Sequence, residues 1–481
     1  MTYYFYDLET SGLNPRRSRI MQFAGQRTDE NLNPIGKPHN ILVKLTDDVL
    51  PEPDAILVTG ITPQKTLEKG ISEIEFLRIL NDEVFIPNTT ISGFNNISFD
   101  DEFIRFTNWR NFYDAYEWHW LDGRKRFDVL HLVWITRALR PDGIKWPFDK
   151  DKKAVNRLEI LAKENKLEHN HAHDALSDVN ATIALARLIK DKQPKLFDYL
   201  IKMTDKKNCS EILNLNNPQP VVHSSGRISS NYKKTSVVFP IAPHPVYPSS
   251  LLVYDLRFNP TEFADLSIEE LEKRAFTPHN RLKEDSKNRL PVKAIHLNKS
   301  PAIAPIGVLN DEAQENIDLT LEKVYKNLEI LKSFIGFGDK MSSVFQTEDK
   351  TASPDADTAL YDGFINDSSD KQKMRQVRNL NEDQLADFDP GFKDERLSEL
   401  LLRFKARNYP SSLSQREELI WESVRTELLT SGKGNFTFSQ FYKRIAELED
   451  QPQTDTRRQI LSDLKEYADS IKPHEPISFN I

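Results

Sequence analysis

The sequence predicts an α/β protein in which a mixed-sheet domain is followed by a small β-rich domain and an all-helical domain. Extended aromatic and β-branched runs alternate with helical patterns up to about residue 190. After Gln193-Pro194 the chain changes to short Pro-, Ser- and Val-containing runs, and from Ala359 to Ile471 the apolar residues follow a helical spacing. Alternating strands and helices are typical of a sheet covered by helices.

In the first domain, three strands come before most of the helices. They are expected at Tyr3–Leu8, Ile20–Arg27 and Ile41–Leu45, the last two joined by a turn at Asn33-Pro34. A helix should begin at Ser72 and run to Phe85, because Ser72 and Glu75 form a capping-box pattern. A strand at Thr90–Phe94 follows, and later helices are expected at Asp100–Phe106, Asp128–Leu139, Arg157–Asn165 and Asp174–Ile189.

The changes in pattern divide the chain into domains at 1–192, 193–348 and 356–475. Polar residues over 346–358 follow no periodic pattern and indicate a linker. In the middle domain we expect strands at Thr235–Ile241, Leu251–Leu256 and Pro291–Leu297, and helices at Ser267–Ala275 and Leu319–Phe334. In the last domain the clearest amphipathic helices are Arg396–Tyr409 and Arg416–Leu429.

The composition narrows the class of protein. Hydrophobic residues make up 38% and charged residues 29% of the chain, which is a globular balance. No apolar run reaches the ~18 residues of a membrane helix, and the N-terminal residues lack the flanks of a signal peptide. The single cysteine, Cys209, excludes an intrachain disulfide and a cysteine zinc site. We therefore expect a cytoplasmic protein that does not associate with membranes.

Two carboxylates close the first strand. Asp7 and Glu9 are two residues apart, so their side chains point to the same face of the sheet. Two acids held together repel each other unless a cation lies between them, and hard oxygen ligands suit Mg²⁺ or Mn²⁺. On its own, such a pair is more often two solvated acids at a strand end.

Further acidic and histidine residues follow in a fixed order. Asp100 stands at a helix start in Asn95-Asn96-Ile97-Ser98-Phe99-Asp100, where it would otherwise be read as a helix cap. His173 and Asp178 lie in His173-Asp174-Ala175-Leu176-Ser177-Asp178, at and just inside another helix start. Taken singly, each of these residues has an ordinary structural explanation.

Taken in order, the three segments have the pattern D-x-E-T-[ST]-G, N-x-x-F-D and H-D-A-x-x-D. This resembles the exonuclease motifs of the DEDD superfamily, histidine subtype. Further segments are similar to the bacterial exonuclease I family, including Ala138-Leu139-Arg140-Pro141-Asp142-Gly143, Arg157-Leu158-Glu159, Gln193-Pro194-Lys195-Leu196-Phe197-Asp198-Tyr199 and Leu360-Tyr361-Asp362-Gly363-Phe364. The resemblance implies a ribonuclease H-like exonuclease domain with a mixed sheet, a small β-barrel-like domain and a helical C-terminal domain.

The resemblance also implies an activity: processive 3′ to 5′ hydrolysis of single-stranded DNA to 5′-mononucleotides, in DNA repair and recombination. By this resemblance Asp7, Glu9, Asp100 and Asp178 hold two Mg²⁺ ions, with Mn²⁺ as a substitute. His173 is then the general base, a role that suits a side chain titrating near neutral pH.

Residues that contact the DNA strand or a partner are less sharply indicated. Aromatic faces and cations bind single-stranded DNA without reading sequence, and the candidates of this kind are Arg105, Tyr116 and Trp120. The resemblance implies that Arg157 contacts a substrate phosphate, and Glu9 is a further candidate for substrate binding. The resemblance also implies binding to the acidic C-terminal tail of single-stranded DNA-binding protein. Arg140 and Tyr199 lie in the matching segments and are the candidates for that contact. A monomer is expected, because the proposed DNA groove is complete within one chain.

Three other functions fit parts of the pattern. A related enzyme could trim RNA 3′ ends, although the C-terminal segments favour DNA. A non-catalytic single-stranded DNA-binding scaffold could keep the fold, but such decay usually removes a metal carboxylate or the histidine. A proofreading subunit would need only the first domain.

Overall fold

The computed structural model describes residues 2–168, 174–277, 288–346, 353, 355–431 and 436–473. Its first part is a five-stranded mixed sheet in the order β3-β2-β1-β4-β5. The strands are β1 (Thr2–Thr10), β2 (Ile20–Thr28), β3 (Pro34–Leu42), β4 (Thr89–Gly93) and β5 (Lys125–Asp128). β1 runs antiparallel to β2 and parallel to β4, so the mixed sheet expected from the sequence is confirmed.

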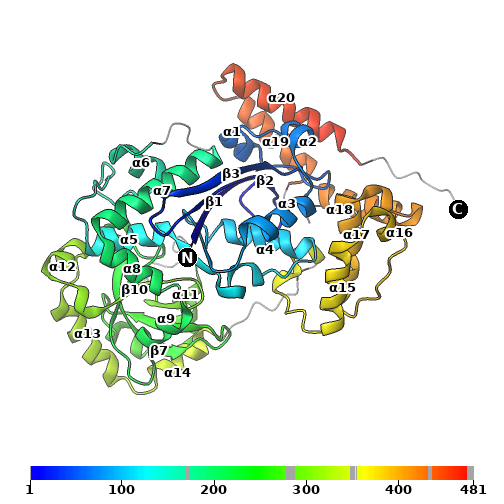
Figure 1. Ribbon diagram of the computed structural model, residues 1–481. Helices are drawn as coiled ribbons and strands as arrows, with labels where there is room; N and C mark the ends of the chain where they lie inside the picture. The colour runs from blue at the N-terminus through cyan, green and yellow to red at the C-terminus, as the bar shows by residue number, and fades with distance from the viewer. Residues whose placement is uncertain are drawn as a thin grey trace.

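Helices cover both faces of this sheet (Figure 1). The helices up to residue 212 are α1 (Pro53–Thr59), α2 (Pro63–Lys69), α3 (Glu73–Ile79), α4 (Asp100–Arg110), α5 (Val129–Leu139), α6 (Leu158–Glu164), α7 (Ala175–Lys192), α8 (Pro194–Lys202) and α9 (Lys206–Ile212). Of these, α9 packs instead with strands that follow residue 220. The even-numbered side chains Tyr4, Tyr6 and Leu8 of β1 pack with residues of α3 and α4. Tyr3 and Phe5 pack on the opposite face with residues of α5 and α7.

The middle part is a five-stranded antiparallel sheet in the order β10-β6-β7-β8-β9. Its strands are β6 (Val221–Ser224), β7 (Thr235–Pro243), β8 (Ser250–Asp255), β9 (Val292–His296) and β10 (Ala302–Pro305). Its helices are α10 (Thr261–Ala264), α11 (Ile268–Phe276), α12 (Asp311–Ile317), α13 (Leu321–Ser333) and α14 (Phe337–Val344). Over the described residues the two outer strands do not pair with each other, so the expected barrel-like sheet is not a closed barrel.

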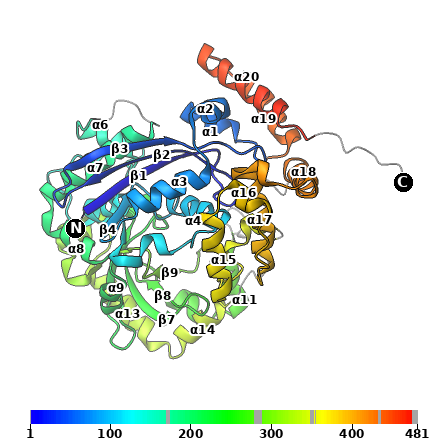
Figure 2. The same cartoon turned by 45° about the vertical axis from the view of Figure 1, so that its right-hand side comes forward.

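The last part is helical, as expected. It contains α15 (Ser368–Asn379), α16 (Glu382–Ala386), α17 (Glu395–Asn408), α18 (Gln415–Thr430), α19 (Phe438–Glu449) and α20 (Asp455–Ser470). Figures 1 and 2 show α19 and α20 beside α1 and α2, and residues of α1, α19 and α20 share one apolar cluster. None of the described helices combines the length and the apolar composition needed to cross a lipid bilayer.

The structure corrects three local predictions. The third strand is Pro34–Leu42 rather than Ile41–Leu45; it is an exposed edge strand, where prolines are tolerated and no apolar pattern marks it. The short strand β5 was not predicted, because its Lys-Arg-Phe-Asp sequence lacks a strand-like alternation. The helix that begins after the Ser72 cap has the predicted capping box, but changes to a π-helix over Leu80–Val84.

Candidate active site

Strand β1 directs two carboxylates toward helix α7. Asp7 and Glu9 lie on the same face of the strand as Phe5, which packs in the cluster that includes α7. Asp7 pairs with Ala24 and Glu9 with Gln22 on β2, and the register shifts directly after Glu9. The two acids therefore stand at the last regular positions of a strand that is firmly held by its neighbours.

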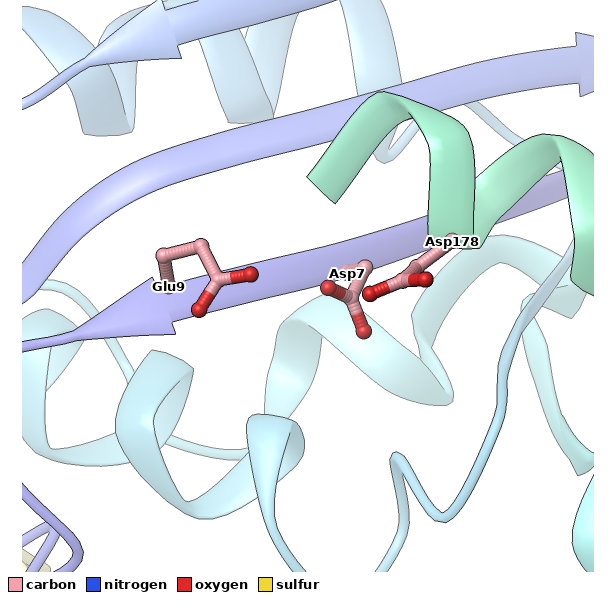
Figure 3. A group of neighbouring side chains, drawn as sticks. All are labelled: Asp7, Glu9 and Asp178. Carbon is pink, nitrogen blue, oxygen red and sulfur yellow. The ribbon is translucent and has the colours of Figure 1, made fainter. Parts of the chain in front are cut away.

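Helix α7 brings in the third carboxylate. The side chain of Asp174 caps the helix by accepting a hydrogen bond from the Ser177 N–H, which places Asp178 in the first turn. Figure 3 shows the Asp178 side chain beside Asp7, with Glu9 further along the strand. Carboxylate oxygens of Asp7, Glu9 and Asp178 all lie within 4.8 Å of one another. Residues 171 positions apart in the chain thus form one acidic group.

Asp100 joins this region from the other side. It is the first residue of α4, whose N-cap is Phe99, so the helix does not use Asp100 as its cap. Its Oδ1 instead accepts a hydrogen bond from the backbone N–H of Leu8 at 3.2 Å. Asp100 is only 3% exposed and is therefore bound to the backbone of the strand that carries Asp7 and Glu9.

The electrostatics of the site reflect this crowding of like charges. Burial raises the pKa of Asp7 well above its ordinary value, and Asp100, Glu9 and Asp178 raise it further. Burial, Asp178 and Asp174 raise the pKa of Glu9 to about 8. The pKa of Asp100 is also well above its ordinary value, because the residue is buried and next to Asp101. Without a cation, the folded protein holds these carboxyls at a cost in free energy.

A bound divalent cation would remove that cost. The donors are carboxylate oxygens, which are the ligands that Mg²⁺ and Mn²⁺ prefer. Three of the four predicted ligands already lie within 4.8 Å of one another, and Asp100 approaches through its contact with β1. The residues present therefore fit a hard divalent metal ion, and the arrangement can support hydrolysis of a phosphate ester.

Of two further residues predicted in the first domain, the structure describes Arg157 but not His173. His173 lies outside the described residues, immediately before the Asp174 cap of α7. Arg157 is the N-cap residue of α6, with 69% of its side chain exposed and an ion pair to Glu159. The structure thus shows Arg157 as an exposed side chain paired with a neighbouring acid.

The predicted strand-binding residues lie at or near α4. Arg105 is 5% exposed, forms an ion pair with Glu102, and lies 5.4 Å from the ring centre of Tyr116. The Tyr116 ring also packs on Phe364 of the C-terminal part, with ring centres 5.6 Å apart. Trp120 is 55% exposed. Of these three, Trp120 offers the most open surface for stacking by a base.

The predicted partner-binding residues come from the adjacent helices α5 and α8. Arg140 ends α5, and its Nη2 donates a hydrogen bond to the carbonyl of Val308 at 3.2 Å. Tyr199 on α8 is partly buried, and burial raises the pKa of its hydroxyl to about 12. That hydroxyl has no hydrogen-bond partner within the described part of the chain.

Sequence reasoning missed the buried polar residues that support the acids. Asp101 is 0% exposed and Arg126 is 3% exposed, and the two form an ion pair of 2.7 Å. Asp101 was visible only as the second acid of an Asp-Asp pair, and Arg126 as one cation among several. Nothing in the local pattern indicates that they meet.

Comparison with family models divides the chain into three matches. Residues 4–186 match the family described as Exonuclease, residues 204–347 the Exonuclease I SH3-like domain, and residues 354–471 the Exonuclease I C-terminal domain. The first match contains all five residues predicted to be catalytic.

Relatives and solved structures resemble nearly the whole chain. Exodeoxyribonuclease I of Haemophilus influenzae is 38% identical over 439 residues, which is 91% of this chain and 93% of the relative. The crystal structure of E. coli Exonuclease I in complex with a dA16 oligonucleotide has a TM-score of 0.92 at 34% identity, covering 98% of this chain and 100% of that one. A crystal structure of SSB/Exonuclease I with the inhibitor CFAM has a TM-score of 0.89 at 35% identity, covering 98% and 99%. With its acidic group in place at the end of β1, the chain belongs to the exodeoxyribonuclease I family.

Proposed function

We propose that this protein removes nucleotides one at a time from the 3′ end of single-stranded DNA and releases 5′-mononucleotides. The observation that carries the proposal is the acidic group of Asp7, Glu9 and Asp178 in an exonuclease domain. The oligonucleotide complex of the E. coli relative supports single-stranded DNA as the substrate. Roles in DNA repair and recombination are part of the same proposal and rest on the family resemblance.

An exonuclease domain of this type works with divalent metal ions. We propose two Mg²⁺ ions, with Mn²⁺ as a substitute, held by Asp7, Glu9, Asp100 and Asp178. When bound, two such ions activate the attacking water and neutralise the charge that develops on the leaving oxygen. The raised pKa values of Asp7 and Asp100 support this assignment, because a cation is what would allow these buried carboxyls to ionise together.

His173 is proposed as the general base. It would accept a proton from the water that attacks the phosphorus of the terminal phosphodiester. The bond to the 3′ oxygen of the shortened strand breaks, and the phosphate stays on the 5′ side of the released nucleotide. The position of His173, directly before the Asp174 cap and five residues before Asp178, supports a role beside the acidic group.

We propose that the strand is held by Arg157 through its phosphate and by the Trp120 face through stacking. Glu9 would contact the terminal nucleotide, because of the three acids it lies furthest along strand β1 of the protein. Tyr116 and Arg105 would line the same side of the site, where Tyr116 already packs on Phe364. A guanidinium suits phosphate by its two-pronged geometry, and an aromatic face accepts any base.

The two domains that follow residue 192 also need a function. We propose domains at 1–192, 193–348 and 356–475 that together enclose the strand within one monomer, which would make hydrolysis processive. The complex of a relative with SSB supports a second partner, and we propose that Arg140 and Tyr199 bind the acidic tail of that protein. The Tyr199 hydroxyl has no hydrogen-bond partner within the described residues but is buried, so side chains around it would have to move before a tail could reach it.

The test is cleavage of a 5′-labelled single-stranded DNA oligomer by the full chain, with Mg²⁺ and with chelator. Wild type should produce a ladder that shortens from the 3′ end, lost with chelator and in Asp178→Ala. Asp370→Asn is the matched control, because Asp370 is a buried acid of the helical C-terminal part. Strand binding without cleavage would favour a scaffold, and faster cleavage of a matched RNA oligomer would favour RNA trimming.

A further inference from the structure

A buried hydrogen-bond network lies beside the positions that carry Asp7 and Asp100. At its centre is Asp101, which is 0% exposed. Asp101 Oδ1 accepts hydrogen bonds from the Tyr6 hydroxyl at 2.7 Å and from Asn96 Nδ2 at 3.2 Å. Its Oδ2 accepts a hydrogen bond from Arg126 Nη1 at 2.7 Å. Both oxygens are therefore held by protein donors.

Two members of the network are chain neighbours of the proposed metal ligands. Tyr6 directly precedes Asp7 on β1, and Asp101 directly follows Asp100 on α4. Successive strand residues face opposite ways, so Tyr6 can bond to Asp101 while Asp7 faces α7. The hydrogen bond from Leu8 N–H to Asp100 crosses the same junction. Two hydrogen bonds, Tyr6–Asp101 and Leu8–Asp100, thus join β1 to α4 next to Asp7.

The network continues to a loop that joins two strands of the second sheet. Arg126 Nη2 donates a hydrogen bond to the carbonyl of Asn298 at 2.7 Å, and Ser300 Oγ donates one to the carbonyl of Arg126 at 2.6 Å. Residues 298–300 lie in the loop between β9 and β10, and Ser300 has a φ of 44° there. The loop is thus bonded to β5 at the residue that contacts Asp101.

We propose that Asp101 is a positioning residue that, through Tyr6 and Arg126, sets the spacing between Asp7 and Asp100 and links that spacing to loop 298–300. This rests on the proposed function, in which Asp7 and Asp100 hold metal ions. Metal ligands must be held to within ~0.5 Å, and groups that orient ligands affect metal affinity strongly. A buried carboxylate with all its donors in place is rigid enough for this task.

The experiment compares Tyr6→Phe, Asp101→Asn and Ser300→Ala with wild type in the full chain. Mn²⁺ binding to the chelator-treated protein is measured by calorimetry. The Mg²⁺ concentration for half-maximal cleavage and the KM for a single-stranded DNA oligomer are measured separately. The control is again Asp370→Asn, since Asp370 is 1% exposed and accepts backbone hydrogen bonds from Lys393 and Asp394.

Tyr6→Phe and Asp101→Asn should each weaken Mn²⁺ binding and raise the half-maximal Mg²⁺ concentration by about 10- to 100-fold, with KM near that of wild type. Ser300→Ala should change both in the same direction by a smaller factor. Asp370→Asn should lower the melting temperature alone. The proposal is overturned if the network variants only lose stability and keep wild-type Mn²⁺ affinity.

The experiment remains decisive if a variant fails to fold or if the wild-type protein cleaves no DNA. If Asp101→Asn does not fold, Tyr6→Phe decides the question, because it removes one hydroxyl and keeps the ring. If wild type binds Mn²⁺ but cleaves no DNA, the proposed function fails, while the Mn²⁺ affinities still test the positioning role directly.

Discussion

Replacing Glu9 by glutamine should change how the stability of the metal-free protein depends on pH. In the folded chain the pKa of Glu9 is raised from 4.5 to about 8, first by burial and then by Asp178 and Asp174. Between these values the folded protein keeps a proton that the unfolded chain has lost. The free energy of unfolding therefore falls as pH rises, with no penalty below pH 4.5 and the full penalty above about pH 8.

The size of the penalty follows from the same geometry. Two carboxylate charges ~4.8 Å apart repel by about 3.5 kcal/mol at an effective dielectric constant of ~20. The rise in the pKa of Glu9 corresponds to about 5 kcal/mol for a fully buried group. Glu9 is half-buried, so solvent screening reduces the expected effect to ~2 kcal/mol. The stability of Glu9→Gln relative to wild type should rise by that amount from pH 5 to pH 9.

The assay is urea denaturation followed by circular dichroism in chelator from pH 5 to pH 9, repeated with Mg²⁺. A bound cation allows the acids to ionise, so Mg²⁺ should remove most of the difference in pH dependence. Glu322→Gln on the exposed side of α13 is the control, and it should follow the wild-type curve. Parallel curves for wild type and Glu9→Gln in chelator would refute the reasoning.

Two of the remaining predictions concern the proposed site, and the third concerns the buried ion pairs of Arg407. His173→Ala should lower turnover by roughly 10²–10⁴ with little change in the DNA dissociation constant, and full turnover would remove His173 from the mechanism. Trp120→Ala should weaken strand binding by about 1–3 kcal/mol in a fluorescence titration, and unchanged affinity would show that no base stacks there. Arg407→Ala should lower the free energy of unfolding by roughly 3–5 kcal/mol, because Arg407 Nη2 lies 2.7 Å from Asp48 and 2.6 Å from Asp357, both buried. Burial acts to raise the pKa of both carboxyls, but Arg407 holds each pKa below its ordinary value of 3.8. The loss of unfolding free energy in Arg407→Ala should therefore be complete above pH 3.8 and diminish in acid. A loss that does not change with pH would contradict the pairing.

The sequence by itself determined the elements that carry the acids. The period-two pattern of β1 predicted that Asp7 and Glu9 share a face, and the structure places them together. The helix predicted over Asp174–Ile189 is α7, which places Asp178 in its first turn. These features depend on residues a few positions apart, so their physical cause is visible in the linear chain.

Only the tertiary structure decided which distant groups meet. Asp100 could have been a helix cap by sequence, but it bonds to the Leu8 backbone instead. Arg105 was predicted to contact the single-stranded DNA, and the structure shows it buried and paired with Glu102. The pairing of Arg126 with both Asp101 and the carbonyl of Asn298 joins residues 172 positions apart. Local periodicity records which side of an element is buried, whereas the partner of a buried charge depends on how the elements pack, and that packing is decided by the whole chain.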